Sequence, residues 1–152
     1  MELTFEAGNW WSYLLVFVAA AIPVIEVLVV IPAGMLAGLP PVPTATVAVA
    51  GNMSTVVLVA VAGDRMLAWR RGPEQRTRPS ARSQRARALA ERWGVPGLAF
   101  LAPVTTGTHI ATIAALATGS DTRRVLRWMG AGLLVWAIVV ATATAMGMDV
   151  FT

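Results

Sequence analysis

The stretch PVIEVLVVIPAGMLAGLP, residues 23–40, contains a single charged side chain, Glu26, in an apolar run that prolines and glycines interrupt. A proline inside a helix removes a backbone hydrogen bond and kinks or ends the helix. The pattern therefore predicts a helical hairpin rather than one straight helix, with Glu26 close to the turn.

The rest of the chain is almost as apolar as this stretch. Of its 152 residues, 57% are hydrophobic and 13% are charged, and this charged share is about half of that in a soluble globule. Residues 7–63 carry no charge besides Glu26, and residues 128–148 carry none. Because roughly 20 apolar helical residues cross a bilayer, we expect a single all-helical integral membrane domain over residues 1–152.

Two of the four apolar runs are continuous and two are broken. Residues 42–63 and 125–148 are long enough to cross a membrane. Prolines, glycines and polar residues break the runs 11–39 and 94–119, and we expect each to be a re-entrant hairpin that enters the membrane and returns to the same side. We expect the turns of these hairpins at Pro23, Pro32, Gly34, Pro103 and Gly107.

The arginines decide between two topologies. Nine of the 12 basic residues lie between Arg65 and Arg92, and the others are Arg123, Arg124 and Arg127. Four plain crossings would separate these two groups, whereas two hairpins and two crossings keep all of them on one side. Since basic loops stay in the cytoplasm, we favour the hairpins. The chain is then a multi-pass protein of the bacterial inner membrane, with both termini outside and the basic linker in the cytoplasm.

Glycines recur at the same spacing in both halves of the chain. Gly38 precedes Gly51 by 13 residues, and Gly119 precedes Gly132 by 13. Each half crosses the membrane once, so the second is inverted relative to the first, an arrangement that recurs in transporters. The chain is then a first repeat, a basic linker with a surface helix and a second repeat, over about 11–63, 64–93 and 94–148.

Glu26 is the first candidate for a functional side chain. It lies about 15 residues into the first run, and at about 1.5 Å per residue this depth is near the bilayer centre. A charge there costs about 2.5–3.5 kcal/mol on insertion scales, and ionisable groups at that depth are usually functional. Desolvation favours the neutral acid, which makes Glu26 a candidate proton carrier. The alternative is a carboxylate that only caps backbone N–H groups at the turn.

His109, the only histidine, occupies the matching depth in the second run. Since an imidazole titrates near neutral pH, His109 could form a proton relay or an ion pair with Glu26; the alternative is a neutral histidine bonded to a threonine hydroxyl or a carbonyl. Asn52, Thr105 and Thr106 could line a polar, substrate-binding cavity with them. Asn52 could equally be a plain interhelical contact.

The composition excludes several classes of site. The chain has no Cys and one His, so we expect neither disulfides nor a metal site. No cofactor motif or nucleophile motif is present, and we expect no cofactor and no enzyme activity. The basic linker lacks the interleaved aromatic residues of nucleic-acid-binding surfaces. We therefore expect it to contact anionic membrane lipids and to bind no nucleic acid.

Two segments resemble a known family. The stretch quoted above, followed by AVAGN at residues 48–52, resembles the first half of the small multidrug export proteins, and RWGVPGLAFLAPVTTGTHIATIAALATGSDTRRVLRWMGAGLLVW at residues 92–136 resembles their second half. That family is related to the DedA superfamily. The resemblance implies paired re-entrant hairpins in inverted repeats, and transport or flipping of lipids in some relatives. The chain departs from the family at Leu28, where members usually have Arg, and at His109, where they have Trp.

These observations predict a membrane transporter that forms a homo-oligomer. We expect it to export small amphipathic substrates, either drug-like compounds or lipids, and to couple this movement to protons through Glu26. One alternative is a flippase for an anionic lipid, with headgroups gathered by Arg123, Arg124 and Arg127. The other alternative, from a different class, is a structural or assembly protein of the membrane that transports nothing.

Overall fold

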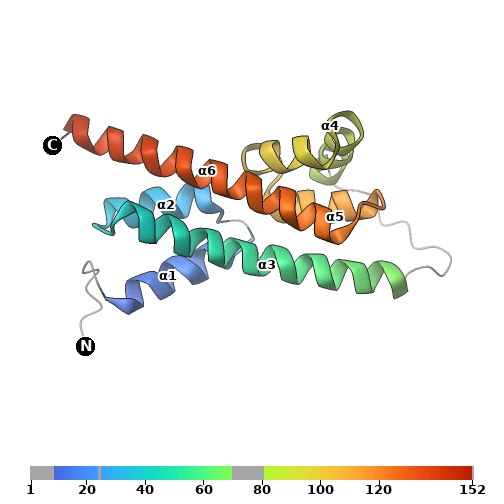
Figure 1. The fold of residues 1–152 in the computed structure, drawn as a ribbon, viewed down its shortest axis with the longest axis horizontal. Coiled ribbons are helices and arrows are strands. Elements are labelled where there is room, and N and C mark those ends of the chain that lie inside the picture. The colour runs from blue at the N-terminus through green and yellow to red at the C-terminus, as the bar shows by residue number, and fades with distance from the viewer. Residues whose placement is uncertain (1–8, 24, 70–80, 152) are drawn as a thin grey trace. The chain divides into compact units, whose positions relative to one another are not determined.

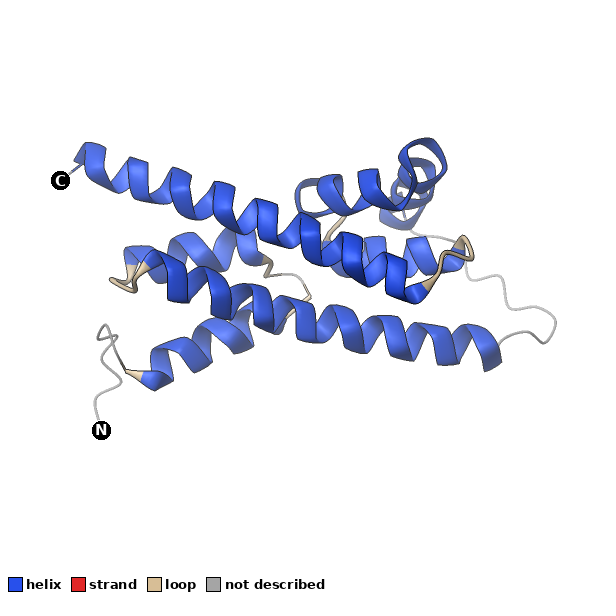
Figure 2. Cartoon of the chain, viewed as in Figure 1, coloured by secondary structure: helices blue, strands red, loops and turns tan. Residues whose placement is uncertain are grey.

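A computed structural model describes residues 9–23, 25–69 and 81–151 of the chain, and within them it gives no side chains for 64, 66–69, 81–91 and 149–151. These described residues form six helices and no strand (Figure 1, Figure 2). The helices are α1 (Trp10–Ala21), α2 (Val27–Leu36), α3 (Pro41–Trp69), α4 (Ala81–Thr105), α5 (Thr108–Ala117) and α6 (Thr122–Phe151). The all-helical prediction is therefore confirmed for the described part of the chain.

The chain divides into two compact units. Unit 1 is Met1–Ser54 with Leu133–Thr152, and unit 2 is Thr55–Gly132. Both long helices, α3 and α6, contribute one segment to each unit. The predicted termini at residues 1–8 and 152, and residues 70–80 of the basic linker, lie outside the described residues.

Helices α1 and α2 form the hairpin of unit 1. The side-chain oxygen of Asn9 accepts a hydrogen bond of 3.2 Å from the Trp11 N–H and so caps the start of α1. The helix ends at Ala21, two residues before Pro23, because a proline disfavours the helical conformation of the residue before it. The core of this unit is formed by buried apolar side chains of four helices: Val16, Ala20, Val27, Ile31, Met35, Ala48, Leu133 and Ala137.

The end of α4 and α5 form the hairpin of unit 2, and Figure 1 shows them beside each other. Gly94 has φ 66° and ψ −172°, so it breaks α4 at the point where the basic linker meets the apolar run. A second break follows Thr105, where Gly107 has φ 87°. Glycine adopts this positive φ without strain, which explains why the chain reverses there.

The two units repeat the same elements 81 residues apart. The boundaries of the helices match in pairs at this offset: Val27 and Thr108, Leu36 and Ala117, Pro41 and Thr122. Gly38 and Gly119, at the same offset, both have positive φ, of 90° and 82°. Both also donate a backbone hydrogen bond of 2.9 Å to the carbonyl three residues earlier. The glycines that recur in the sequence therefore mark a repeat in the structure, in which the boundaries of the helices recur together with the glycine turns that end them.

Each repeat also contains one close contact between a glycine and a neighbouring backbone. A Cβ atom at Gly51 in α3 would overlap the carbonyl oxygen of Phe17 in α1. A Cβ atom at Gly132 in α6 would lie 2.5 Å from the carbonyl oxygen of Ala99 in α4. A helix backbone cannot move aside as a flexible side chain can, so both positions require glycine.

Helices α3 and α6 contain the only described segments long and apolar enough to cross a membrane, Pro41–Gly63 with 23 residues and Thr122–Met148 with 27. Their most apolar windows are only 28% and 22% buried, and side chains such as Leu58 and Ile138 are each 66% exposed. A core helix of a soluble protein would be mostly buried. The described helices α1, α2 and α5 have 12, 10 and 10 residues, fewer than the roughly 20 that a crossing needs.

Candidate functional site

Glu26 lies in the break between α1 and α2, as predicted. It is the extended residue that begins α2, with φ −84° and ψ 172°. Its backbone carbonyl accepts hydrogen bonds from the N–H groups of Val29 and Val30, at 2.9 and 3.2 Å. The side chain makes no capping bond to α2, and the residue is only 6% exposed. The hairpin therefore buries a carboxylate that does not serve as the cap of its own helix.

Three uncharged polar residues are buried with Glu26 in unit 1. Asn52 is fully buried on α3 and follows Gly51, the point of closest contact with α1. Sequence reasoning missed the other two, Ser12 and Thr44. The Thr44 hydroxyl donates a 2.7 Å hydrogen bond to the carbonyl of Pro40, which is a local bond within the start of α3. Among the side chains that the structure describes in this unit, Glu26 is the only charged one.

His109 is buried in the first turn of α5, in unit 2. It is 4% exposed, and its Nε2 atom lies 2.8 Å from the hydroxyl oxygen of Thr55 on α3, in a hydrogen bond whose donor depends on the tautomer of the ring. The sequence indicated a threonine hydroxyl as one partner for His109 but did not identify Thr55. The two residues are 54 positions apart, so no local pattern could pair them.

Three threonines near His109 in the sequence are also buried: Thr106, Thr108 and Thr112. The Thr112 hydroxyl donates to the carbonyl of Thr108 at 2.8 Å. The Thr106 hydroxyl is buried without a hydrogen-bond partner among the described residues. Thr105, which was predicted to line a polar cavity, is exposed, and its hydroxyl donates to the Leu101 carbonyl at 2.8 Å. Thr105 is thus separate from this buried threonine cluster.

The residues predicted to mark hairpin turns fall into two groups. Pro23 and Gly107 lie at the breaks between helices, as expected. Pro32 and Gly34 lie inside α2, and Pro103 lies inside α4. The prediction of a turn at these three positions is wrong, because a helix tolerates a proline where packing holds its neighbours in place.

The described arginine side chains all belong to unit 2. Arg123, Arg124 and Arg127 are exposed on the first turns of α6, and Arg65 and Arg92 are exposed as well. The start of α6 is capped by Asp121, whose side-chain oxygen accepts a 2.8 Å hydrogen bond from the Arg123 N–H. Trp128 packs edge-on against Phe100, with 6.4 Å between the ring centroids. An exposed Trp beside Arg is typical of a membrane surface.

These candidate residues are divided between the two units. Glu26 and Asn52 belong to unit 1, and His109, Thr55 and Thr106 belong to unit 2. A buried carboxylate and a buried imidazole can each take up and release a proton. No group of three or more His, Cys, Asp or Glu that could hold a metal ion occurs in the part of the chain that the structure describes.

A comparison with known families identifies the chain. The family described as "Putative small multi-drug export protein" matches residues 26–139, a range that begins at Glu26, after α1, and extends through the second hairpin into α6. No curated protein and no solved structure gives a significant match. The family and the two long apolar helices together indicate a membrane protein with a role in export. The chain belongs to the small multi-drug export protein family.

Proposed function

We propose that this protein is a transporter, and not an enzyme, that exports small amphipathic compounds across the bacterial inner membrane and couples this movement to protons through Glu26. Membership of an export family supports the class of function. The observation that carries the coupling is the burial of Glu26 at a helix break, in a unit whose other described side chains are uncharged.

The ends of the two long helices support a membrane orientation. Arg65 lies towards the end of α3, and Arg123 lies at the start of α6. If both ends are cytoplasmic, the segment between them begins and ends on the same side. Its apolar helices, residues 95–105 and α5, are each about 15 Å long at roughly 1.5 Å per residue, about half of the bilayer core. These lengths fit a hairpin that enters the membrane and returns.

The 81-residue repeat supports the same arrangement for α1 and α2 from the opposite side, with both termini outside. Such inverted repeats are what a relationship to the DedA superfamily would imply. Each hairpin break then brings its own polar residues about half-way across the bilayer: Glu26 in unit 1 and His109 in unit 2. We also propose that the protein functions as a homo-oligomer, because a membrane domain of only 152 residues is small for a transporter and often needs a partner copy.

In this mechanism Glu26 carries its proton through the occluded state in one half of the cycle, since burial of a charge is costly. In the other half the deprotonated carboxylate returns with its charge offset by a cationic group of the exported compound. When the hairpin is exposed to the side of higher proton concentration, the carboxylate binds a proton, and it releases the proton on the other side. The exported compound moves in the opposite direction.

The test is transport by the purified full chain in lipid vesicles with an imposed pH gradient, using ethidium as the fluorescent amphipathic substrate. We expect the wild type to transport faster as the gradient increases. We expect Glu26→Gln, which keeps the shape of the side chain but cannot carry a proton, to lose at least nine tenths of this gradient-driven rate. Asp121→Asn, a change at an exposed carboxylate, is the matched control and keeps the wild-type rate. Equal transport by wild type and Glu26→Gln at every pH refutes the proposed coupling.

A second candidate function is the flipping of an anionic lipid. The observation that favours it is the exposed group Arg123, Arg124 and Arg127, which is placed to contact phosphate headgroups. In the same vesicles, a fluorescent anionic lipid would change leaflets at a rate that falls when all three are replaced by Gln. An unchanged rate rules this function out and leaves the export of small compounds.

A further inference from the structure

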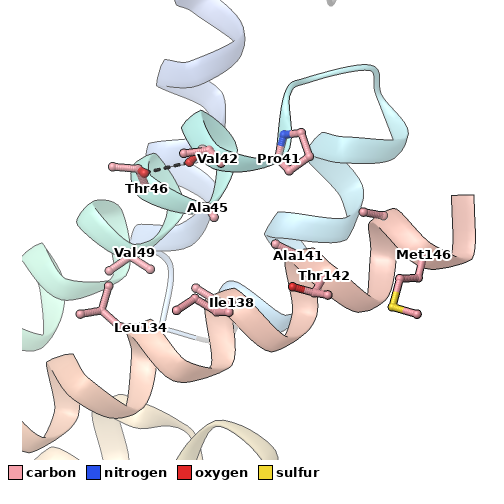
Figure 3. A pocket seen from close by; sticks show the side chains of 12 residues that line it. Pro41, Val42, Ala45, Thr46, Val49, Leu134, Ile138, Ala141, Thr142 and Met146 are labelled. Atoms are coloured by element: carbon pink, nitrogen blue, oxygen red, sulfur yellow. Dashed lines mark hydrogen bonds between the residues drawn. The ribbon is translucent and has the colours of Figure 1, made fainter. Parts of the chain in front are cut away.

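An apolar groove lies between the first turns of α3 and the second half of α6, entirely within unit 1 (Figure 3). Its volume is about 510 Å³, within the roughly 300–1,000 Å³ of small-molecule sites. Ala45 on α3 and Ala141 on α6 leave it hollow, and larger apolar side chains such as Leu134 and Ile138 form its sides. No charged side chain is among the described residues that line it.

Two hydroxyl groups are the polar features of this groove. The Thr46 hydroxyl donates a 2.8 Å hydrogen bond to the Val42 carbonyl of its own helix (Figure 3), so it can only accept a further bond. Thr142 on α6 is exposed, and its hydroxyl makes no hydrogen bond with a described residue. Its hydroxyl can both donate and accept. A ligand that contains a hydrogen-bonding group within an apolar body therefore matches this groove better than a saturated acyl chain, which offers no such group.

The position of the groove along the two helices indicates the side of the membrane. Residues 41–49 lie at the end of α3 away from Arg65, and residues 134–146 lie in the half of α6 away from Arg123. With the arginine ends in the cytoplasm, the groove lies in the outer half of the bilayer. This is the side to which an exporter delivers its substrate.

We propose that this groove is a binding site for the apolar body of an amphipathic compound that contains a hydrogen-bonding group, which the Thr142 hydroxyl orients before release to the outer leaflet. The role of this site in export rests on the proposed function. The binding of a ligand in the groove does not depend on it. A compound bound there keeps any charged group outside the groove, because nothing in the lining offsets a charge.

The test is binding of N-phenyl-1-naphthylamine, an apolar fluorophore with one N–H group, to the full chain in phosphatidylcholine nanodiscs without a pH gradient. We expect saturable binding above the signal of empty nanodiscs. Ala141→Phe fills the groove and weakens binding at least tenfold. Ala143→Phe places the same ring at an exposed α6 position outside the lining, and leaves binding within twofold of the wild type.

A second pair of variants does not depend on filling the groove. Thr142→Val removes the exposed hydroxyl at constant shape and weakens binding about threefold, as expected for one net hydrogen bond. Thr144→Val is the control, since the Thr144 hydroxyl donates to the Val140 carbonyl of its own helix. Binding that does not saturate, or that Ala141→Phe and Ala143→Phe weaken equally, overturns the proposal. Saturable groove binding in a protein that exports nothing supports the site and overturns the exporter role.

Discussion

The two hairpins match in the boundaries of α2 and α5 and differ at the breaks before these helices. Glu26 begins α2, and Gly107 begins α5 at the position 81 residues later. The first hairpin thus has a carboxylate at its break where the second has no side chain. Conversely, His109 in the second hairpin corresponds to Leu28 in the first. The repeated helices therefore provide a common frame, and the ionisable groups are specific to each half.

The units differ in charge as well as in chemistry at the break. Every arginine side chain that the structure describes belongs to unit 2, and the only described charge in unit 1 is Glu26. The described charged side chains therefore do not follow the repeat of the helices. This asymmetry is what a membrane protein needs, because symmetric halves with equal charge would not specify which side faces the cytoplasm.

The largest expected loss of stability tests the close contact between helices that both repeats contain. Gly51→Ala and Gly132→Ala each force a methyl group against a helix carbonyl, and each should cost about 3 kcal/mol, near the upper end of overpacking effects. Unfolding in detergent micelles, followed by fluorescence, measures the loss. Gly147→Ala, also in α6, is the control, because a Cβ atom there meets nothing within 4 Å. A loss at one of the two glycines only would break the correspondence between the halves.

A smaller effect is expected for a feature that only one half has. Thr55→Val keeps the shape of the side chain but removes the 2.8 Å hydrogen bond to His109 Nε2. The expected loss of stability is about 2 kcal/mol, because the ring nitrogen stays buried after its partner is removed. Thr46→Val, at an exposed hydroxyl that bonds its own helix, serves as the comparison in the same unfolding experiment. Equal stability of the two variants would contradict a structural role for the Thr55–His109 bond.

The smallest expected effect concerns the helix ends. Gly38→Ala and Gly119→Ala introduce a Cβ atom at φ values of 90° and 82°, where an L-residue is strained by about 1 kcal/mol. Neither position has a neighbour within 4 Å of that atom, so the cost comes from the backbone alone and should be equal in both units. Asn, which tolerates positive φ better, should recover part of the loss at both positions. Unequal melting temperatures for the two Ala variants would show that the two ends are not equivalent.

Much of the fold was predictable because its signals are local. The continuous runs 42–63 and 125–148 lie within α3 and α6, and Pro23 and Gly107 lie at breaks between helices. Hydropathy and backbone preferences act within a few residues, so the sequence contains them directly. The inverted placement of the two repeats in a membrane and the role of Glu26 in coupling stay predictions.

The candidate sites were only partly predictable because they depend on where each helix ends and on how the helices pack. Thr105 is the last residue of α4 and is exposed, whereas Thr106 lies in the turn that follows and is buried. Their shared chemistry in the sequence does not distinguish them. Thr55 was missed for a related reason, since its pairing with His109 depends on how α3 packs against a helix 54 residues away. The prediction of a turn at Pro32 was wrong because a proline in the sequence does not show whether the packing around it allows a continuous helix.

The division of α6 between the two units has a consequence for biosynthesis. Unit 2 is one uninterrupted segment, Thr55–Gly132, whereas unit 1 needs Leu133–Thr152 in addition to the first part of the chain. Leu133 and Ala137 belong to the buried core of unit 1, so this core cannot close until this part of α6 has been synthesised. The half that is translated first is therefore completed only after unit 2 has been synthesised, and the hairpin with Glu26 lacks part of its core until then.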